Sequence, residues 1–223
     1  NIARHTVVTC TPPVPTAGSP AESRSHPAKL PRAEPDHAAI ACGDVRAATQ
    51  VLAEHGLPVT VFVVSELAGT TNAWEDNDRS SMPVLPLLGW EALSRLASEG
   101  VSLGAHGRTH ARLPGLSPDR LIDELAGSKA RIEGETGNTV RAFAYPYGAA
   151  DRKSVEAVRR EFAVACTAEL GVLSAAEDPH QLPRLDAYYF QAPGRLEAWG
   201  SPAFARHVRW RAAARKLRAW FRP

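Results

Sequence analysis

The hydrophobic pattern is ordered from Asp44 onward, where short apolar runs alternate with segments whose apolar residues recur every three or four positions. The first kind of segment is typical of buried strands and the second of amphipathic helices. This pattern predicts helices over residues 44–56, 89–100, 117–132 and 151–162. It predicts strands over residues 58–64, 101–106, 140–146 and 163–167.

Turn and capping residues support these boundaries. Gly56 and Gly100 follow the first two helical segments, as glycine commonly does at helix C-termini. Ser117 and Pro118 have the residue types favoured at an N-cap and at the first helical position. Strands and helices that alternate with short connections favour an α/β protein with a parallel sheet or barrel. Chemistry in such proteins gathers at the carboxyl ends of the strands.

The first 43 residues differ from the rest in composition and hydrophobic pattern. Prolines recur throughout them, and apart from the short run HTVVTC they show no apolar periodicity. Proline interrupts helices and is excluded from central strands, so this composition predicts an irregular or disordered segment. We therefore divide the chain into that segment (1–43), an α/β barrel domain (44–203) and a basic helix (204–223).

Composition narrows the classes of function. A net charge of +2 is too small to indicate a nucleic-acid-binding protein. The three cysteines are far apart, so they predict neither a disulfide framework nor a CxxC metal site. No apolar run is long enough to span a membrane and no signal peptide is evident, which leaves the compartment open.

Two histidines follow the predicted strand over residues 101–106. His106 and His110 are four residues apart, and Gly107 between them favours a turn over a helix. Neutral imidazoles are ligands for Zn, Fe, Co or Ni, but a catalytic zinc ion usually takes three protein ligands. From spacing alone, a metal site and an ordinary polar loop both remain open.

A second turn follows the strand over residues 140–146, in the segment RAFAYPYG. Pro146 and Gly148 predict a tight turn, and Tyr145 and Tyr147 could line a cleft or simply pack. Both turns fall at the carboxyl edge of the predicted sheet. With VLAEHGLPVTVFVV, ELAGSKARIEGETG and LPRLD, they resemble the polysaccharide deacetylase (chitin deacetylase, NodB-like) family over residues 44–187.

The resemblance implies a distorted, incomplete (β/α)7-type barrel and a metal-dependent hydrolase that removes N-acetyl groups from amino sugars of a glycan or glycan precursor. By that resemblance His106 and His110 are metal ligands, with zinc expected and cobalt or nickel as alternatives. Tyr147 supplies a backbone N–H for the oxyanion, and Arg184 lies near the catalytic carboxylate. Substrate-binding roles fall to Tyr145, Pro146 and Gly148.

The chain departs from this family at the first motif. The family has an Asp-Asp pair, the catalytic base and third metal ligand, where this chain has Ala39 and Ile40. No Asp-Asp pair occurs anywhere in the chain, so we expect weakened metal binding. The segment AEPDHAAIA is a poor core strand, so we also expect the first strand to be missing. A disrupted gene start is one hypothesis. The other is a variant that recruits Asp36, His37 or Asp44 as the third ligand.

Two functions therefore remain open: an N-deacetylase, and an inactive carbohydrate-binding or scaffold protein that keeps the barrel. The C-terminal segment poses a separate question, because FARHVRWRAAARKLRAWFRP carries seven basic and no acidic residues. It is predicted to form a helix that either packs on the barrel or lies on an anionic membrane surface.

Overall fold

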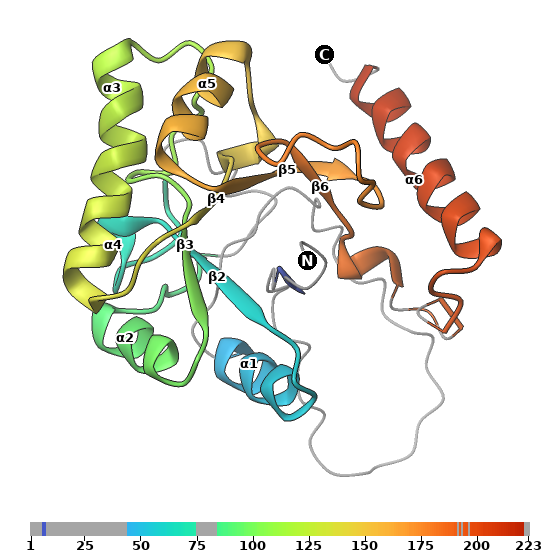
Figure 1. Cartoon of the computed structure of the whole chain (residues 1–223), viewed down its shortest axis with the longest axis horizontal. Helices are drawn as coiled ribbons and strands as arrows, with labels where there is room; N and C mark the ends of the chain where they lie inside the picture. Colours follow the sequence, from blue (N-terminus) through green and yellow to red (C-terminus); the bar gives the residue numbers. More distant parts are fainter. Residues whose placement is uncertain are drawn as a thin grey trace.

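The computed structural model describes residues 6–7, 44–74, 84–190, 192, 194–195 and 197–220. Its centre is a curved six-stranded sheet in which every pair of neighbours runs parallel, in the order β1-β2-β3-β4-β5-β6 (Figure 1). The strands are β1 (Thr6–Val7), β2 (Val59–Val63), β3 (Ser102–Ala105), β4 (Ala142–Ala144), β5 (Val164–Leu170) and β6 (Leu182–Arg184).

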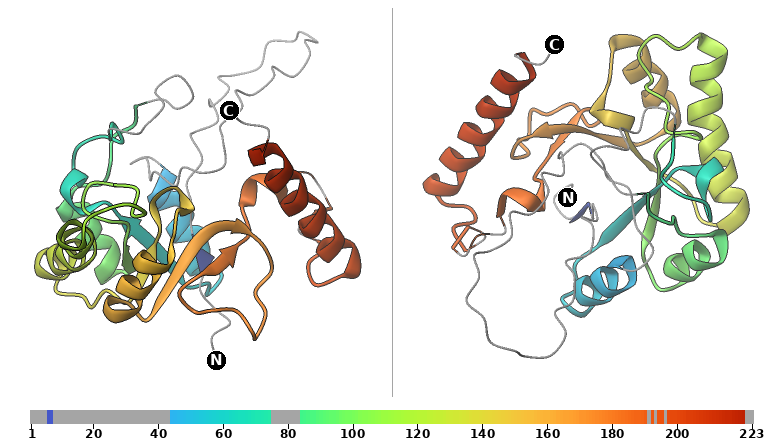
Figure 2. Two further views of the ribbon diagram at one scale, coloured as in Figure 1. Left: turned by 90° about the horizontal axis from the view of Figure 1, so that it is seen from above. Right: turned by 180° about the vertical axis from the view of Figure 1, so that it is seen from behind.

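Helices surround this sheet on its outer side, as two further views show (Figure 2). The α-helices are α1 (Asp44–Glu54), α2 (Trp90–Ser98), α3 (Pro118–Ile122), α4 (Ser128–Thr136), α5 (Arg152–Glu161) and α6 (Pro202–Trp220). The shorter elements are the 3-10 helices η1 (Ser65–Leu67), η3 (Pro146–Gly148) and η4 (Ala187–Phe190), and a π-helix η2 (Asp123–Gly127) that joins α3 to α4.

Two hydrophobic clusters hold these layers together. The larger lies between the sheet and α1 to α5, and Phe143, Ala105 and Ile132 in it are fully buried. The smaller cluster packs α6 against η4 and the end of β5. It consists of Leu170, Tyr189, Phe190, Phe204 and Val208. Within the part of the chain described, no helix has the length and apolarity needed to cross a bilayer.

The parallel α/β architecture predicted from the hydrophobic pattern is confirmed. The expected loss of the first strand requires a correction, because β1 pairs in parallel with β2, with Thr6 opposite Val59. The edge position beside β2 is thus filled by the short apolar run near the start of the chain. Asp36, Ala39 and Ile40 lie outside the described residues, so the expectations about them are not tested.

A candidate metal centre at the carboxyl ends of the strands

His106 directly follows β3, and its side chain is 5% exposed. Its backbone N–H donates to the carbonyl of Val63 at 2.9 Å, which extends the β2–β3 ladder by one residue. The ring Nδ1 lies 2.7 Å from the carbonyl oxygen of Ala144 at the end of β4. A carbonyl can only accept, so Nδ1 carries the proton and the lone pair of Nε2 remains for a ligand.

The ionisation of His106 agrees with this tautomer. The pKa of His106 is lowered from 6.5 to about 4, mainly by burial; the hydrogen bond to Ala144 opposes this effect, and the positive charge of Arg184 makes a smaller contribution in the same direction as burial. The ring is therefore neutral near pH 7, which is the form that binds a metal ion.

His110 lies beside His106, as the two-ligand prediction requires. The ring centroids of these two histidines are 4.8 Å apart, in an edge-to-face arrangement. Trp74 stacks on the other side of the His110 ring at 4.0 Å, and the Tyr147 ring meets its edge at 4.6 Å. His110 has a φ of 65°, an unusual backbone conformation for a residue other than glycine. The neighbouring residues therefore fix both the backbone conformation and the ring orientation of His110.

The described residues contain no group of three histidine, cysteine, aspartate or glutamate side chains that could hold a metal ion. Asp36, His37 and the side chain of Asp44 are not described, so none of the candidate third ligands is tested. The two imidazoles suit a divalent metal ion, and they form an incomplete set of ligands for a catalytic zinc site.

The turn after β4 brings a third element to the histidines. Tyr147 and Gly148 both have positive φ angles, 59° and 64°, so the chain turns sharply out of the strand. The ring of Tyr147 is partly exposed beside His110, and the guanidinium carbon of Arg112 lies 5.1 Å from its centroid. Arg184, at the end of β6, is close enough for its charge to lower the pKa of His106. The predicted residues Tyr147 and Arg184 thus border the histidine pair.

Tyr145 and Pro146 occupy a different position from Tyr147. Tyr145 is 2% exposed, its hydroxyl donates to the carbonyl of His180 at 3.0 Å, and its ring meets Phe143 edge-on. Burial also raises the pKa of Tyr145 far above its usual range. Pro146 is buried as well. Both residues can therefore shape the turn, but their side chains are buried and not exposed at the carboxyl edge of the sheet.

Two residues at this site were not predicted. Trp74 belongs to a polar loop, where a single tryptophan was the only available signal, and it is buried in the structure. Glu124 is 0% exposed and lies on η2 between apolar positions, so an acidic residue within an apolar stripe could have indicated it. Asn72 supports the Trp74 loop, because its side-chain oxygen accepts from the Leu85 N–H at 2.7 Å.

Comparison with known proteins agrees with this architecture. YxkH of Bacillus subtilis (strain 168), a curated relative with a deacetylase family designation, is 22% identical over 136 residues. That match covers 60% of this chain and 44% of YxkH, so the chain spans less than half of that relative. Among solved structures, Streptococcus pyogenes deacetylase PplD has a TM-score of 0.54 at 22% identity, covering 64% of this chain and 58% of PplD.

IcaB from Ammonifex degensii has a TM-score of 0.54 at 23% identity, covering 75% of this chain and 70% of IcaB. At such identities these likenesses establish the fold alone. The family assignment rests on residues 43–161, more than half of the chain, which match the sequence model of polysaccharide deacetylases. By that match, the chain belongs to the polysaccharide deacetylase family.

Proposed function

We propose that the site binds a divalent metal ion through His106 and His110 and removes the N-acetyl group from an amino sugar of a glycan or glycan precursor. The observation that carries this proposal is the adjacency of two buried imidazoles, one with its tautomer set by the Ala144 carbonyl. We expect zinc, with cobalt or nickel as alternatives, because imidazole nitrogens are ligands for these divalent metals. A third ligand would have to come from outside the described residues.

The roles of the surrounding residues follow from their positions. When bound, the metal ion supplies Lewis acidity toward the acetamide carbonyl and lowers the pKa of a water molecule. Tyr147 would direct a backbone N–H toward the oxyanion from its left-handed turn. Trp74 excludes water from one side of His110, and Arg184 adds positive charge near developing negative charge. Tyr145, Pro146 and Gly148 would hold that turn against the substrate.

Zinc titration and acetate release from N-acetylglucosamine oligomers test this proposal. We expect His106→Ala to weaken zinc binding by more than about tenfold, since loss of a supporting partner alone typically costs that much. Acetate release should disappear in the same variant. His55→Ala is the control, because His55 is exposed and follows α1. Equal zinc affinity in wild type and His106→Ala would contradict the metal site.

A second candidate is an inactive carbohydrate-binding protein. It is favoured by the absence of an Asp-Asp pair from the chain, since the family uses that pair as base and ligand. The same assay separates the two functions. Saturable binding of the oligomers without acetate release, at any zinc concentration, would establish the second candidate and reject the first.

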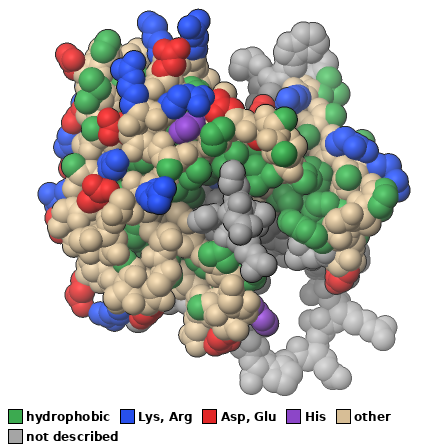
Figure 3. Space-filling view, in the orientation of Figure 1, with side chains coloured by type: hydrophobic (Ala, Val, Ile, Leu, Met, Phe, Trp, Pro, Cys, Tyr) green, Lys and Arg blue, Asp and Glu red, His purple; other side chains and the backbone are tan. Residues whose placement is uncertain are grey.

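We also propose that α6 contacts an anionic membrane surface. Trp210 and Leu217 lie seven residues apart on this helix and are 64% and 57% exposed. Arg206, Arg209 and Lys216 are exposed beside them, and the helix contains no acidic residue. Figure 3 shows basic side chains along α6 at the right of the molecule. Apolar anchors among basic residues suit the interface of a bilayer with anionic lipids.

Sedimentation with phosphatidylglycerol vesicles tests this contact. Trp210→Ser/Leu217→Ser should reduce vesicle binding by at least about tenfold, because two apolar anchors are lost. These substitutions leave Phe204 and Val208, which attach α6 to β5, unchanged. Val172→Ser/Leu173→Ser is the matched control, since both side chains are 51% exposed elsewhere. Unchanged binding in the α6 variant would leave only the packing role for this helix.

A further inference from the structure

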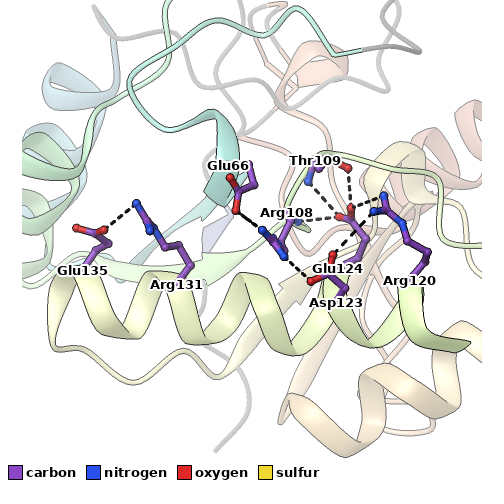
Figure 4. A network of polar contacts seen from close by, with 8 residues as sticks. All are labelled: Glu66, Arg108, Thr109, Arg120, Asp123, Glu124, Arg131 and Glu135. Carbon is purple, nitrogen blue, oxygen red and sulfur yellow. Dashed lines mark hydrogen bonds and ion pairs between the residues drawn. The ribbon is translucent and has the colours of Figure 1, made fainter.

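The π-helix η2 carries a buried carboxylate, Glu124, whose hydrogen-bond partners lie in the loop between the two histidines. The guanidinium group of Arg120 on α3 also pairs with it, at 3.8 Å. One oxygen of Glu124 accepts from the backbone N–H groups of Arg108 at 2.7 Å and Thr109 at 3.1 Å (Figure 4). The other oxygen accepts from the hydroxyl of Thr109 at 2.6 Å. A buried carboxylate is costly unless it is hydrogen-bonded, and charge-assisted bonds of this kind are strong.

The other side of this loop is held by the backbone of η1. The Ser65 N–H donates to the carbonyl of Gly107 at 3.2 Å, and the Glu66 N–H donates to that of Arg108 at 2.9 Å. Carbonyls of the loop thus face η1, while its N–H groups face Glu124. The loop is fixed from both sides along the segment that separates His106 from His110.

Gly107 shows how closely Glu124 approaches. Gly107 has a φ of 79°, and a Cβ atom added to it would lie 2.9 Å from a carboxylate oxygen of Glu124. The absence of a side chain at Gly107 therefore admits Glu124 to the backbone of the loop. His110 then follows with its own positive φ of 65°, a conformation that persists only when neighbouring contacts impose it.

The ion pairs around Arg108 constrain the loop less than the hydrogen bonds of Glu124 do. Its guanidinium group bonds Glu66 at 2.6 and 3.0 Å and also pairs with Asp123, so it bridges η1 and η2. The Arg108 side chain is 32% exposed and the two carboxylates more so, and solvent-exposed ion pairs contribute little. Glu124, which is fully buried and bonds the backbone directly, is the stronger constraint.

We propose that Glu124 is a positioning residue that fixes the relative orientation of the His106 and His110 rings. This inference deepens the proposed function, because it rests on the two histidines acting as metal ligands. Glu124 bonds the loop through its backbone and the Thr109 hydroxyl. Its effect passes through the N–H groups of Arg108 and Thr109, which set where the chain places His110 after His106.

Glu124→Gln tests the proposal, because it keeps the volume and places an NH2 group among N–H donors. We expect zinc affinity to fall by about tenfold to a hundredfold, as it does when supporting partners of metal ligands are removed. Ring nitrogen NMR signals of His110 in the metal-free, histidine-labelled protein should shift or broaden. A role confined to stability would leave those signals unchanged.

Glu133→Gln is the matched control. Glu133 lies on α4, is partly buried and also accepts a backbone N–H, from Val140 at 2.8 Å, so this variant removes a carboxylate acceptor remote from the histidines. Unchanged ring signals in both variants would overturn the proposal, even if Glu124→Gln alone were less stable. Shifted signals in Glu124→Gln alone would uphold positioning. If wild type then bound no zinc, the metal-site proposal alone would fail.

Discussion

Gly148→Ala is expected to lower the free energy of unfolding by about 3 kcal/mol. A Cβ atom at Gly148 would lie 2.3 Å from the Cβ of Ala168 and 2.6 Å from its backbone nitrogen. Ala168 belongs to β5, so relief requires the turn after β4 to move away from the sheet. Gly148 also has a φ of 64°, which an alanine adopts only with strain.

Gly137→Ala separates the steric from the conformational part of this cost. Gly137 has a similar φ of 69°, but a Cβ atom there would meet nothing within 4 Å. This variant should therefore lose only about 1 kcal/mol. Urea denaturation of both variants, with unfolding followed by circular dichroism, measures the difference. Equal stabilities would show that β5 yields easily to the turn.

The same turn shows what hydrophobic patterning can and cannot predict. Residues two apart in a strand point to the same face, so the pattern gave Tyr145 and Tyr147 equivalent prospects of lining a cleft. The chain leaves β4 before Tyr145, and the left-handed conformation at Tyr147 sends the two rings in different directions. A backbone reversal of this kind depends on the space that β5 leaves, which is a property of the folded chain.

Regular elements were predictable because their signals are local. The helix α5 begins at Arg152, directly after Asp151, and Asp151 and Ser154 form a reciprocal capping box. β2 falls within the predicted apolar run. Four of its five residues are buried, which explains why the run is apolar. The histidine pair and the YPYG turn could be placed at a shared rim for the same reason, because each follows the end of a strand.

Features that depend on distant partners could not be predicted in the same way. β1 is only two residues long and pairs with Val59 and Thr60, more than fifty positions later in the chain. Glu124 accepts hydrogen bonds from backbone N–H groups sixteen and fifteen residues earlier in the chain. Neither partnership leaves a periodic signal, so the support of the candidate site emerges only from tertiary structure.

The metal-free protein is expected to lose roughly 3 kcal/mol of stability between pH 6.5 and pH 4 through His106 alone. Burial lowers the pKa of His106 from its ordinary 6.5 to about 4 in the folded chain. Between these values the unfolded chain binds a proton at His106 that the folded chain does not. Stability from His106 is therefore complete above about pH 6.5 and is lost as pH falls toward 4.

His106→Asn isolates this contribution, because asparagine does not titrate and its amide can still donate toward the carbonyl of Ala144. Urea denaturation with a chelator present, at pH 7, 5.5 and 4.5, gives the free energy of unfolding of each protein. The free energy of unfolding of the wild type should exceed that of the variant by less as pH falls, or should become the smaller of the two. If the difference in the free energy of unfolding did not change with pH, His106 would gain and lose its proton like an exposed histidine. Protonation would then compete with metal binding near pH 6, whereas a pKa near 4 keeps this ligand available throughout the neutral range.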